Sequence, residues 1–200
     1  MVTDVFGAVV PGRPTGVLAD VWGRSAVRDV VLTVGAAAAV GLAAQLALPV
    51  PGSPVPITGQ TFAVLLAGAV LGPGRGVAGM VLYAVAGILG VPWFADGGSG
   101  WPGATGGYLL GFIVAAALVG RLAALGADRR PGHMIGLMLI GNLLIYLCGV
   151  PWLALATTLD VPEAVSQGLF PYLLGDALKM TLAIGLLPGA WLLLDRKRAG

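Results

Sequence analysis

Two oppositely charged residues stand inside the last apolar run of the sequence. Asp176 and Lys179 lie within residues 172–194, and no other ionisable residue lies so deep in an apolar run. On a helix, residues three apart project from the same face and can touch. Each charge in mid-membrane costs about 2.5–3.5 kcal/mol on insertion scales. The pair is therefore either an ion pair that packs a bundle or part of a polar binding site. We favour the site, because Asp176 follows Tyr172 by one turn, about 6 Å below the outer interface.

Several other polar and aromatic residues are expected at the same outer level of the membrane. They are Thr58, Gln60, Tyr83, Trp93, Phe94, Trp101 and Tyr108. Tryptophan and tyrosine also form interfacial belts in membrane proteins, and a glutamine can simply start a helix, so each residue alone has an ordinary explanation. Together they predict a small pocket with aromatic walls, a few hydrogen-bonding groups and one charge pair.

The composition requires a membrane around these residues. Of 200 residues, 58% are hydrophobic and only 10% are charged, whereas soluble domains carry about 25% charged residues. This excludes an ordinary cytosolic enzyme, a disordered chain and a nucleic-acid binder. The single cysteine, Cys148, cannot form an internal disulfide.

Six apolar runs predict an all-α integral membrane protein with six transmembrane helices. The runs are 30–48, 60–71, 76–91, 106–125, 134–150 (extending as far as 155) and 172–194. At about 18 Å, the second run is short for a hydrocarbon core of about 30 Å. Either it takes length from the proline-rich segment 49–59, or that segment enters the protein as a re-entrant loop. We expect a short, mobile cytoplasmic lead at 1–26, a transmembrane substrate-binding domain at 27–194 and a basic cytoplasmic tail at 195–200.

The basic residues orient the six predicted spans. The outer loops 49–59, 92–105 and 151–171 contain Asp96, Asp160 and Glu163 but no lysine or arginine. The positive-inside rule then places both termini in the cytoplasm. A bias towards Gly, Ala and Arg suggests a bacterial genome, so we expect a multi-pass protein of the bacterial cell membrane. The ten residues on the inner side are Arg13, Arg24, Arg28, Arg75, Arg121, Arg129, Arg130, Arg196, Lys197 and Arg198.

Short matches to catalytic motifs fail in their context. Ser99 sits in a GGSG sequence, but the only histidine, His133, is expected on the other side of the membrane, so no nucleophile–base pair can form. The GRGVAG sequence at 74–79 follows no strand, which argues against a dinucleotide site. One His and one Cys cannot form a zinc site, and no Walker A loop is present. We therefore expect no enzyme activity and no cofactor.

Small residues cover nearly every face of the first span. The candidates for a contact surface with a second membrane protein are Gly35, Ala36, Ala39 and Ala43. Small residues let helices approach closely in lipid. The alternative is that they pack within the chain's own bundle, and the residue types alone do not decide between the two.

Five sequence stretches together resemble one family. They read PVPITGQT at 54–61, LGPGRG at 71–76, GVPWF at 90–94, GATGGYLLGF at 103–112 and GDALK at 175–179. The chain is similar over residues 27–194 to the BioY family, the biotin-specific S components of energy-coupling factor (ECF) transporters. Ala104 stands where the family usually has proline.

This resemblance implies a fold, a ligand and partners. It implies an ECF S-component bundle of six helices with an outward-facing biotin pocket, covered by the first external loop. It maps the family's acidic residue, lysine and first-loop glutamine onto Asp176, Lys179 and Gln60, and assigns Tyr83, Trp93, Phe94, Gly107 and Tyr108 more weakly. It also implies a membrane coupling subunit of the EcfT or BioN type, which meets the first helix, and separate ATPase subunits. Biotin is then a transported ligand.

The chemistry of biotin suits these side chains. A carboxylate such as Asp176 can accept charge-assisted hydrogen bonds from the ureido N–H groups. Lys179 can donate to the ureido oxygen or balance Asp176, and aromatic rings can cover the apolar sulfur ring. The carboxylate of biotin must use Lys179, backbone N–H groups or water. The rival interpretations are an S component for another small vitamin, an intramembrane hydrolase and a packing subunit.

Overall fold

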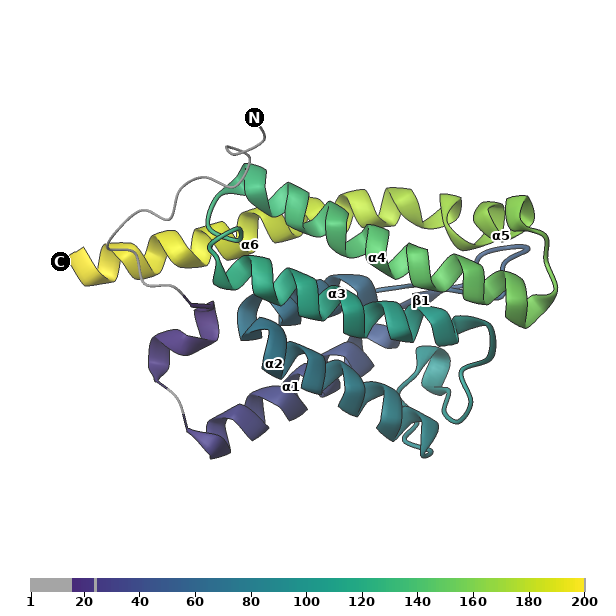
Figure 1. The fold of residues 1–200 in the computed structure, drawn as a ribbon, viewed down its shortest axis with the longest axis horizontal. Helices are drawn as coiled ribbons and strands as arrows, with labels where there is room; N and C mark the ends of the chain where they lie inside the picture. Colours follow the sequence, from purple (N-terminus) through teal and green to yellow (C-terminus); the bar gives the residue numbers. More distant parts are fainter. Residues whose placement is uncertain (1–15, 24, 200) are drawn as a thin grey trace.

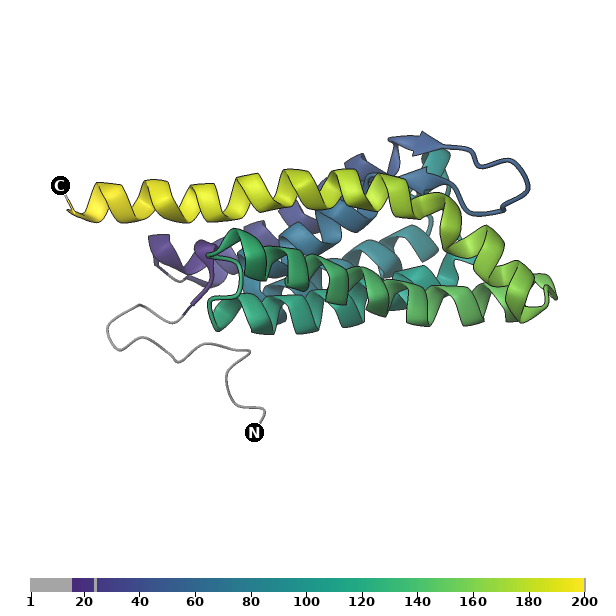
Figure 2. The ribbon, with the colours of Figure 1, turned by 90° about the horizontal axis from the view of Figure 1, so that it is seen from above.

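The protein is a bundle of long helices that run roughly along one axis (Figures 1 and 2). The structure is a computed structural model and describes residues 16–23 and 25–199. The predicted lead therefore lies partly outside the described residues, with Arg13 and Arg24. The elements in chain order are η1 (Leu18–Trp22), α1 (Ala26–Ala44), β1 (Ala47–Leu48), β2 (Ile57–Thr58), α2 (Gln60–Ile88), η2 (Ala95–Gly97), η3 (Gly103–Thr105), α3 (Gly106–Ala124), α4 (Pro131–Thr157), α5 (Val161–Gly168), η4 (Phe170–Tyr172) and α6 (Leu173–Ala199).

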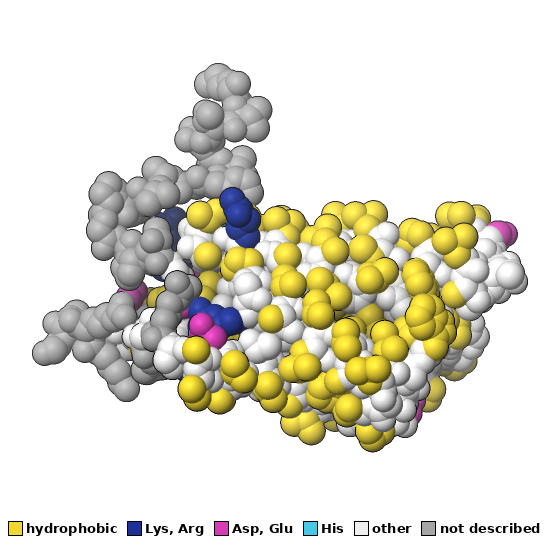
Figure 3. Space-filling view, turned by 60° about the horizontal axis from the view of Figure 1, so that its bottom comes forward, with side chains coloured by type: hydrophobic (Ala, Val, Ile, Leu, Met, Phe, Trp, Pro, Cys, Tyr) yellow, Lys and Arg dark blue, Asp and Glu magenta, His cyan; other side chains and the backbone are white. Residues whose placement is uncertain are grey.

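Five helical segments among the described residues are long and apolar enough to cross a membrane. They are Ala26–Ala44, Gln60–Ile88, Gly103–Ala124, Pro131–Thr157 and Val161–Arg196. Large apolar side chains such as Leu139 and Leu147 on α4 and Leu182 on α6 are more than half exposed. Figure 3 shows apolar side chains spread over the middle of the molecule. Burying such a surface in lipid removes it from water, so the chain is a multi-pass membrane protein.

Helix α2 is a hairpin of two helical arms. Gly72 has φ 81° and ψ 176°, a conformation that L side chains rarely adopt, and Pro73 starts the second arm. Nε2 of Gln60 donates to Oη of Tyr83 at 2.7 Å, although a straight helix would separate these residues by about 34 Å. Figure 1 shows the two arms diverging from this turn. The two arms of α2 count as one of the five segments, so the number of six spans remains a prediction.

The chain is mostly helical, but the predicted end of the first span at Leu48 is wrong. The helix stops at Ala44 and does not reach Leu48, because β1 and β2 pair antiparallel, with Ala47 opposite Thr58. Residues 49–56 are the loop of this hairpin. The proline segment does not extend the second helix, because that helix starts at Gln60. The segment is instead a short β-hairpin with an irregular loop.

The third predicted outer loop is also more helical than expected. Helix α4 continues through Pro151 to Thr157, and α5 follows almost at once. Asp160 caps α5 by accepting a hydrogen bond from the backbone N–H of Glu163 at 2.8 Å. The loop predicted at 151–171 is thus mostly helix.

The described part of the N-terminal lead is packed and not free. Val17 and Ala19 are each 3% exposed. A Cβ at Gly72 would lie 3.4 Å from Cγ1 of Val17, so η1 lies against the turn of α2. Arg75, just after this turn, pairs with Asp20 of η1 and, at 3.4 Å, with Asp29 of α1. These ion pairs fasten three elements at one end of the bundle.

Candidate ligand-binding site

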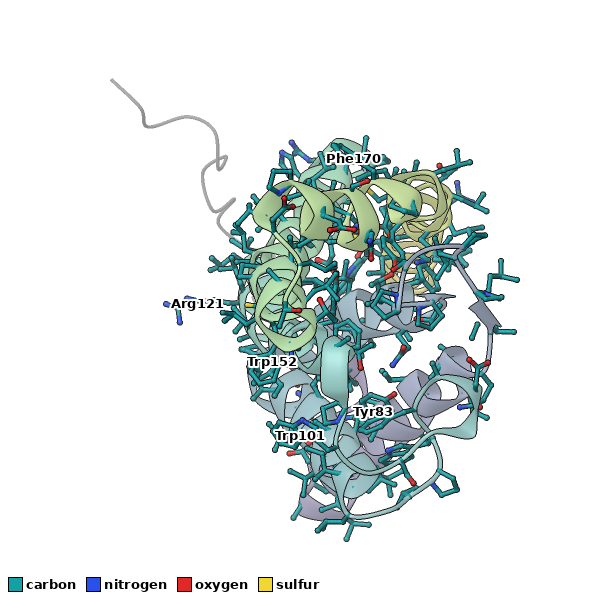
Figure 4. All side chains as sticks on the ribbon, turned by 90° about the vertical axis from the view of Figure 1, so that its right-hand side faces the viewer. Tyr83, Trp101, Arg121, Trp152 and Phe170 are labelled. Atoms are coloured by element: carbon teal, nitrogen blue, oxygen red, sulfur yellow. The ribbon has the colours of Figure 1, made fainter. Side chains whose placement is uncertain are left out.

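A cavity of about 70 Å³ lies at the end of the bundle that carries the β1–β2 hairpin and α5. Figure 4 looks onto this end, with Tyr83 inside the bundle and Arg121 pointing away from it. Seven of the nine predicted ligand-binding residues line the cavity: Thr58, Gln60, Tyr83, Phe94, Tyr108, Asp176 and Lys179. They lie in five separate segments of the sequence, and the fold brings them together.

The carboxylate of Asp176 is the most heavily bonded group of the cavity wall. It is 4% exposed. Its Oδ1 accepts from Nζ of Lys179 at 3.1 Å and from Oγ1 of Thr61 at 3.4 Å. Its Oδ2 accepts from Oη of Tyr146. Three donors from α2, α4 and α6 thus hold one buried carboxylate, and hydrogen bonds of this charge-assisted kind are strong.

Lys179 completes this polar cluster. Its Nζ also donates to Oγ1 of Thr61 at 2.8 Å, so Thr61 bridges the two charges. An ammonium group has three donor hydrogens, and the contacts to Asp176 and Thr61 use two of them. A ligand acceptor in the cavity could therefore receive a hydrogen bond from Lys179 without breaking the ion pair.

A second polar chain starts at the beginning of α2. Oγ1 of Thr58 donates to Oε1 of Gln60 at 2.9 Å, and Nε2 of Gln60 donates to Oη of Tyr83 at 2.7 Å. The Tyr83 hydroxyl in turn donates to the backbone oxygen of Trp93 at 3.3 Å. Gln60 is 8% exposed and Tyr83 is fully buried. This chain fixes the orientation of the Gln60 amide, which presents a donor and an acceptor beside the cavity.

Aromatic rings form the wall of the cavity next to the loop between α2 and α3. The Tyr83 ring lies 5.4 Å from that of Phe94 in an edge-on arrangement and 5.3 Å from that of Trp93. Nε1 of Trp93 donates to the backbone oxygen of Tyr83 at 3.0 Å. Phe94 lines the cavity, whereas Trp93 lies behind Tyr83. Trp93 therefore supports the wall, and its predicted contact with a ligand stays a prediction.

Gly107 packs between helices. A Cβ at this position would clash with Cβ of Trp152 and lie 2.5 Å from the backbone oxygen of Cys148, so Gly107 allows α3 and α4 to approach closely. It is absent from the described lining of the cavity, while its neighbour Tyr108 contributes to it. Oη of Tyr108 donates to the backbone oxygen of Gly168 at 2.7 Å. The position assigned to ligand contact by resemblance thus has a packing role in the structure.

The loop of the β1–β2 hairpin covers one side of the cavity. Val55 and Pro56 line it. Oη of Tyr172, just before α6, lies 2.6 Å from the backbone oxygen of Val55 and 2.9 Å from Oγ of Ser53. These contacts hold the loop over Asp176, which follows Tyr172 by one turn.

The sequence analysis missed several residues of the site. Tyr146 and Tyr172 read as aromatic side chains in or beside apolar runs, and only their hydroxyl groups inside such runs could have signalled a polar site. Gln45 reads as a lone polar residue near the end of α1. Its Nε2 donates to the backbone oxygens of Trp93 and Phe94 at 3.2 and 3.1 Å, so Gln45 ties the second outer loop to α1.

The four small residues of α1 fall on different faces. Gly35 and Ala39 are exposed. Ala36 is 6% exposed and packs on Gly79, where an added Cβ would lie 3.0 Å from that of Ala36. Ala43 is half-buried against Gly59, whose N–H donates to the Ala43 oxygen at 3.1 Å. The structure places Ala36 inside this chain's own bundle, because its side chain is already covered.

The site has the chemistry of a binding pocket. It offers one carboxylate, one ammonium group, an oriented amide and tyrosine hydroxyls on an aromatic wall. Among residues 16–23 and 25–199, no group of three or more His, Cys, Asp or Glu side chains could hold a metal ion.

Comparisons with known proteins agree on one family. A model of the BioY family matches residues 16–196. A probable biotin transporter BioY of Methanothermobacter thermautotrophicus is 44% identical over 133 residues, which cover 60% of this chain and 84% of that protein. One of Pyrococcus horikoshii is 34% identical over 160 residues, covering 78% and 92%. A crystal structure of the S-component for biotin from an ECF-type ABC transporter covers 83% of this chain and 93% of its own, with a TM-score of 0.74 at 21% identity. That likeness shows a shared fold.

Proposed function

Because the chain belongs to the BioY family, we propose that it captures biotin in the cavity beside Asp176 and Lys179 and carries it across the membrane as the S component of an ECF-type importer. The observation that carries this proposal is the cluster of Asp176, Lys179 and Thr61, in which Asp176 is buried, Tyr146 donates to Asp176, and an aromatic wall lies beside it. Buried charges in a membrane protein are expensive unless they serve a ligand or a partner.

We propose that the ureido ring of biotin binds at this charge pair. The two ureido N–H groups can donate to Asp176, and the ureido oxygen can accept from the unused donor of Lys179. The amide of Gln60 presents further polar atoms, and the rings of Tyr83 and Phe94 cover the apolar sulfur ring. We propose secondary ligand contacts for Thr58 and Tyr108, which line the cavity, and for Trp93 and Gly107, which lie outside its described lining.

The size of the cavity supports a loop that moves. Small-molecule sites usually measure about 300–1,000 Å³, and this cavity is about 70 Å³. Biotin therefore needs the hairpin loop or the second outer loop to shift. The hairpin loop is fastened mainly by the Tyr172 hydroxyl to Val55 and Ser53. We propose that this loop opens and closes over the ligand.

We propose six crossings with both termini in the cytoplasm of a bacterial cell. Counting the two arms of α2 separately gives six crossings, and the end of the bundle at its turn carries Arg75 and the ion pairs to Asp20 and Asp29. Figure 3 shows lysine and arginine side chains at the end of the molecule that holds the C-terminus. The positive-inside rule assigns this end to the cytoplasm. Residues 27–194 then form the membrane domain and 195–200 a basic tail.

The proposal also includes partners. The exposed small residues Gly35 and Ala39 on α1 support a surface for a membrane coupling subunit of the EcfT or BioN type, whose ATPase subunits supply the energy. Ala43 lies at the edge of this surface. We assign no catalytic step and no cofactor to the chain itself.

Biotin binding by the purified chain tests this function. Full-length protein in detergent should bind radiolabelled biotin without any nucleotide, because a capture site needs only the groups already in place. Binding that requires ATP or a second protein would overturn the proposal.

A further inference from the structure

A second cavity lies at the opposite end of the bundle from the biotin site. It measures about 310 Å³ and lies between the turn that joins α3 to α4 and the last turns of α6. Figure 2 shows these two segments close together at the end that holds the C-terminus. Its lining is Arg129, Arg130, Pro131, Pro188, Trp191, Leu192 and Asp195. The biotin mechanism uses none of these residues.

Two arginines give this cavity a positive wall. The Arg129 guanidinium lies over the Trp191 ring, 4.4 Å from its centroid, and Nη2 donates to the backbone oxygen of Gly16 at 3.3 Å. The stacking presents the flat side of the guanidinium to the ring. Arg130 is the residue before the first turn of α4, and its side chain is exposed. Asp195 is the one carboxylate in the described lining, so the arginines outnumber it.

The start of α4 adds to this positive wall. Pro131 is the first residue of the helix, and no side chain caps it. The N–H groups of its first turn carry the positive end of the helix dipole, which favours an anion. A carboxylate next to the cavity, Asp128, is fully buried and accepts a hydrogen bond from Nε1 of Trp191 at 2.6 Å. Burial raises the pKa of Asp128, and the neighbouring charge of Arg129 opposes this shift.

An exposed apolar surface of α6 continues from the cavity. Leu192, which lines the cavity, is 60% exposed, and Leu193, the next residue of α6, is 62% exposed. Such side chains suit acyl chains that extend away from a headgroup. In the orientation proposed above, this end lies at the inner leaflet, where basic pockets between helices bind anionic headgroups.

We propose that this cavity binds the phosphate of an anionic phospholipid of the inner leaflet, held by Arg129, Arg130 and the first turn of α4. The shared chemistry is a phosphate group, which a free phosphate ion also carries. The apolar flank favours the lipid, because a free ion gains nothing from Leu192 and Leu193.

Native mass spectrometry of the full-length chain in detergent tests this proposal. With phosphatidylglycerol and phosphatidylcholine added in turn, the chain should retain phosphatidylglycerol at least roughly tenfold more strongly. Arg130→Gln should weaken retention roughly fivefold, and the double variant Arg129→Gln with Arg130→Gln should bring both lipids to the same level. Arg129→Lys keeps the charge but loses the stacking of the guanidinium on Trp191, so its retention of phosphatidylglycerol should lie between that of the unaltered protein and that of the double variant.

Arg121→Gln is the matched control, because Arg121 is exposed and points away from the bundle (Figure 4). It should leave retention unchanged, and thermal unfolding should show that each variant is folded. Three results overturn the proposal. The first is equal retention of phosphatidylglycerol and phosphatidylcholine, and the second is a loss of retention in Arg121→Gln as large as that in Arg130→Gln. The third is displacement of both lipids alike by millimolar inorganic phosphate. The readout involves no biotin, so failure here is distinct from failure of the proposed transport function.

Discussion

The charge pair at the outer site offers the sharpest test of the site geometry. Asp176→Asn keeps the shape of the side chain but removes its charge. Lys179, whose side chain is partly buried at 17% exposed, then keeps only neutral acceptors, Thr61 and the new amide oxygen, and loses its opposite charge. Breaking a buried ion pair on one side costs about 3–5 kcal/mol, and the partial exposure of Lys179 places this case near the lower end.

The effect on biotin follows from the hydrogen bonds that the carboxylate would accept. A hydrogen bond to a charged group is worth about 1.5–3 kcal/mol, so Asp176→Asn should weaken biotin binding roughly 10- to 150-fold. Lys179→Met should weaken it by a similar factor, because the ureido oxygen then loses its charged donor. Equilibrium binding of radiolabelled biotin to purified variants measures both.

A double-mutant cycle separates stability from binding. Asp176→Asn with Lys179→Met leaves no unpaired charge, so its loss of stability should be smaller than the sum of the two single losses. Glu163→Gln, which removes an exposed charge near the same end of the bundle, should change neither quantity. If both single variants bind biotin as tightly as the unaltered protein, the pair only packs the bundle and the proposed pose is wrong.

Three further predictions follow from packing and charge. Gly107→Ala should lower the unfolding temperature by several degrees, because the added Cβ clashes with Trp152. Gly136→Ala is the control, since its added Cβ has no neighbour within 4 Å and should leave the unfolding temperature unchanged. Thermal unfolding in detergent measures both. Ala39→Trp should abolish biotin uptake by cells yet retain biotin binding, since Ala39 is exposed. Ala36→Trp should instead reduce the yield of folded protein, because Ala36 is buried against another helix. Uptake that is retained in Ala39→Trp would argue against the proposed partner surface. Burial raises the pKa of Asp128 in the folded state, so the folded chain binds more protons than the unfolded chain. The free energy of unfolding should therefore fall as the pH rises from about 4 through the raised pKa. Asp128→Asn should flatten this pH dependence, and an unchanged slope in that variant would exclude Asp128 as its source.

The main residues of the site could be predicted because each is a polar exception in an apolar run. Asp176 and Lys179 are charges in a membrane-length segment, and Gln60 follows a proline-rich break. Such exceptions require a physical reason, and the structure places all three on one cavity. Gly107, the one ligand-binding residue that only the resemblance supplied, packs against α4 and is absent from the described lining of the cavity.

The remaining features leave no periodic signal in the sequence. Strands β1 and β2 contain two residues each, too few for an alternating pattern, so the end of α1 was placed four residues too late. Gln45 acts through contacts with residues about 50 positions away, which no local pattern contains. The burial of Ala36 depends on its place opposite Gly79, and a run of uniform small residues does not show which face packs.

The central claim is that the outer cavity selects biotin, and competition on the purified chain tests it most directly. Full-length protein in detergent, without nucleotide, is loaded with radiolabelled biotin and challenged with unlabelled biotin, thiamine and riboflavin. The account predicts that only unlabelled biotin displaces the label at low concentration, and that the Asp176→Asn variant binds the label roughly 10- to 150-fold more weakly. Displacement by thiamine or riboflavin at equal or lower concentration would contradict it.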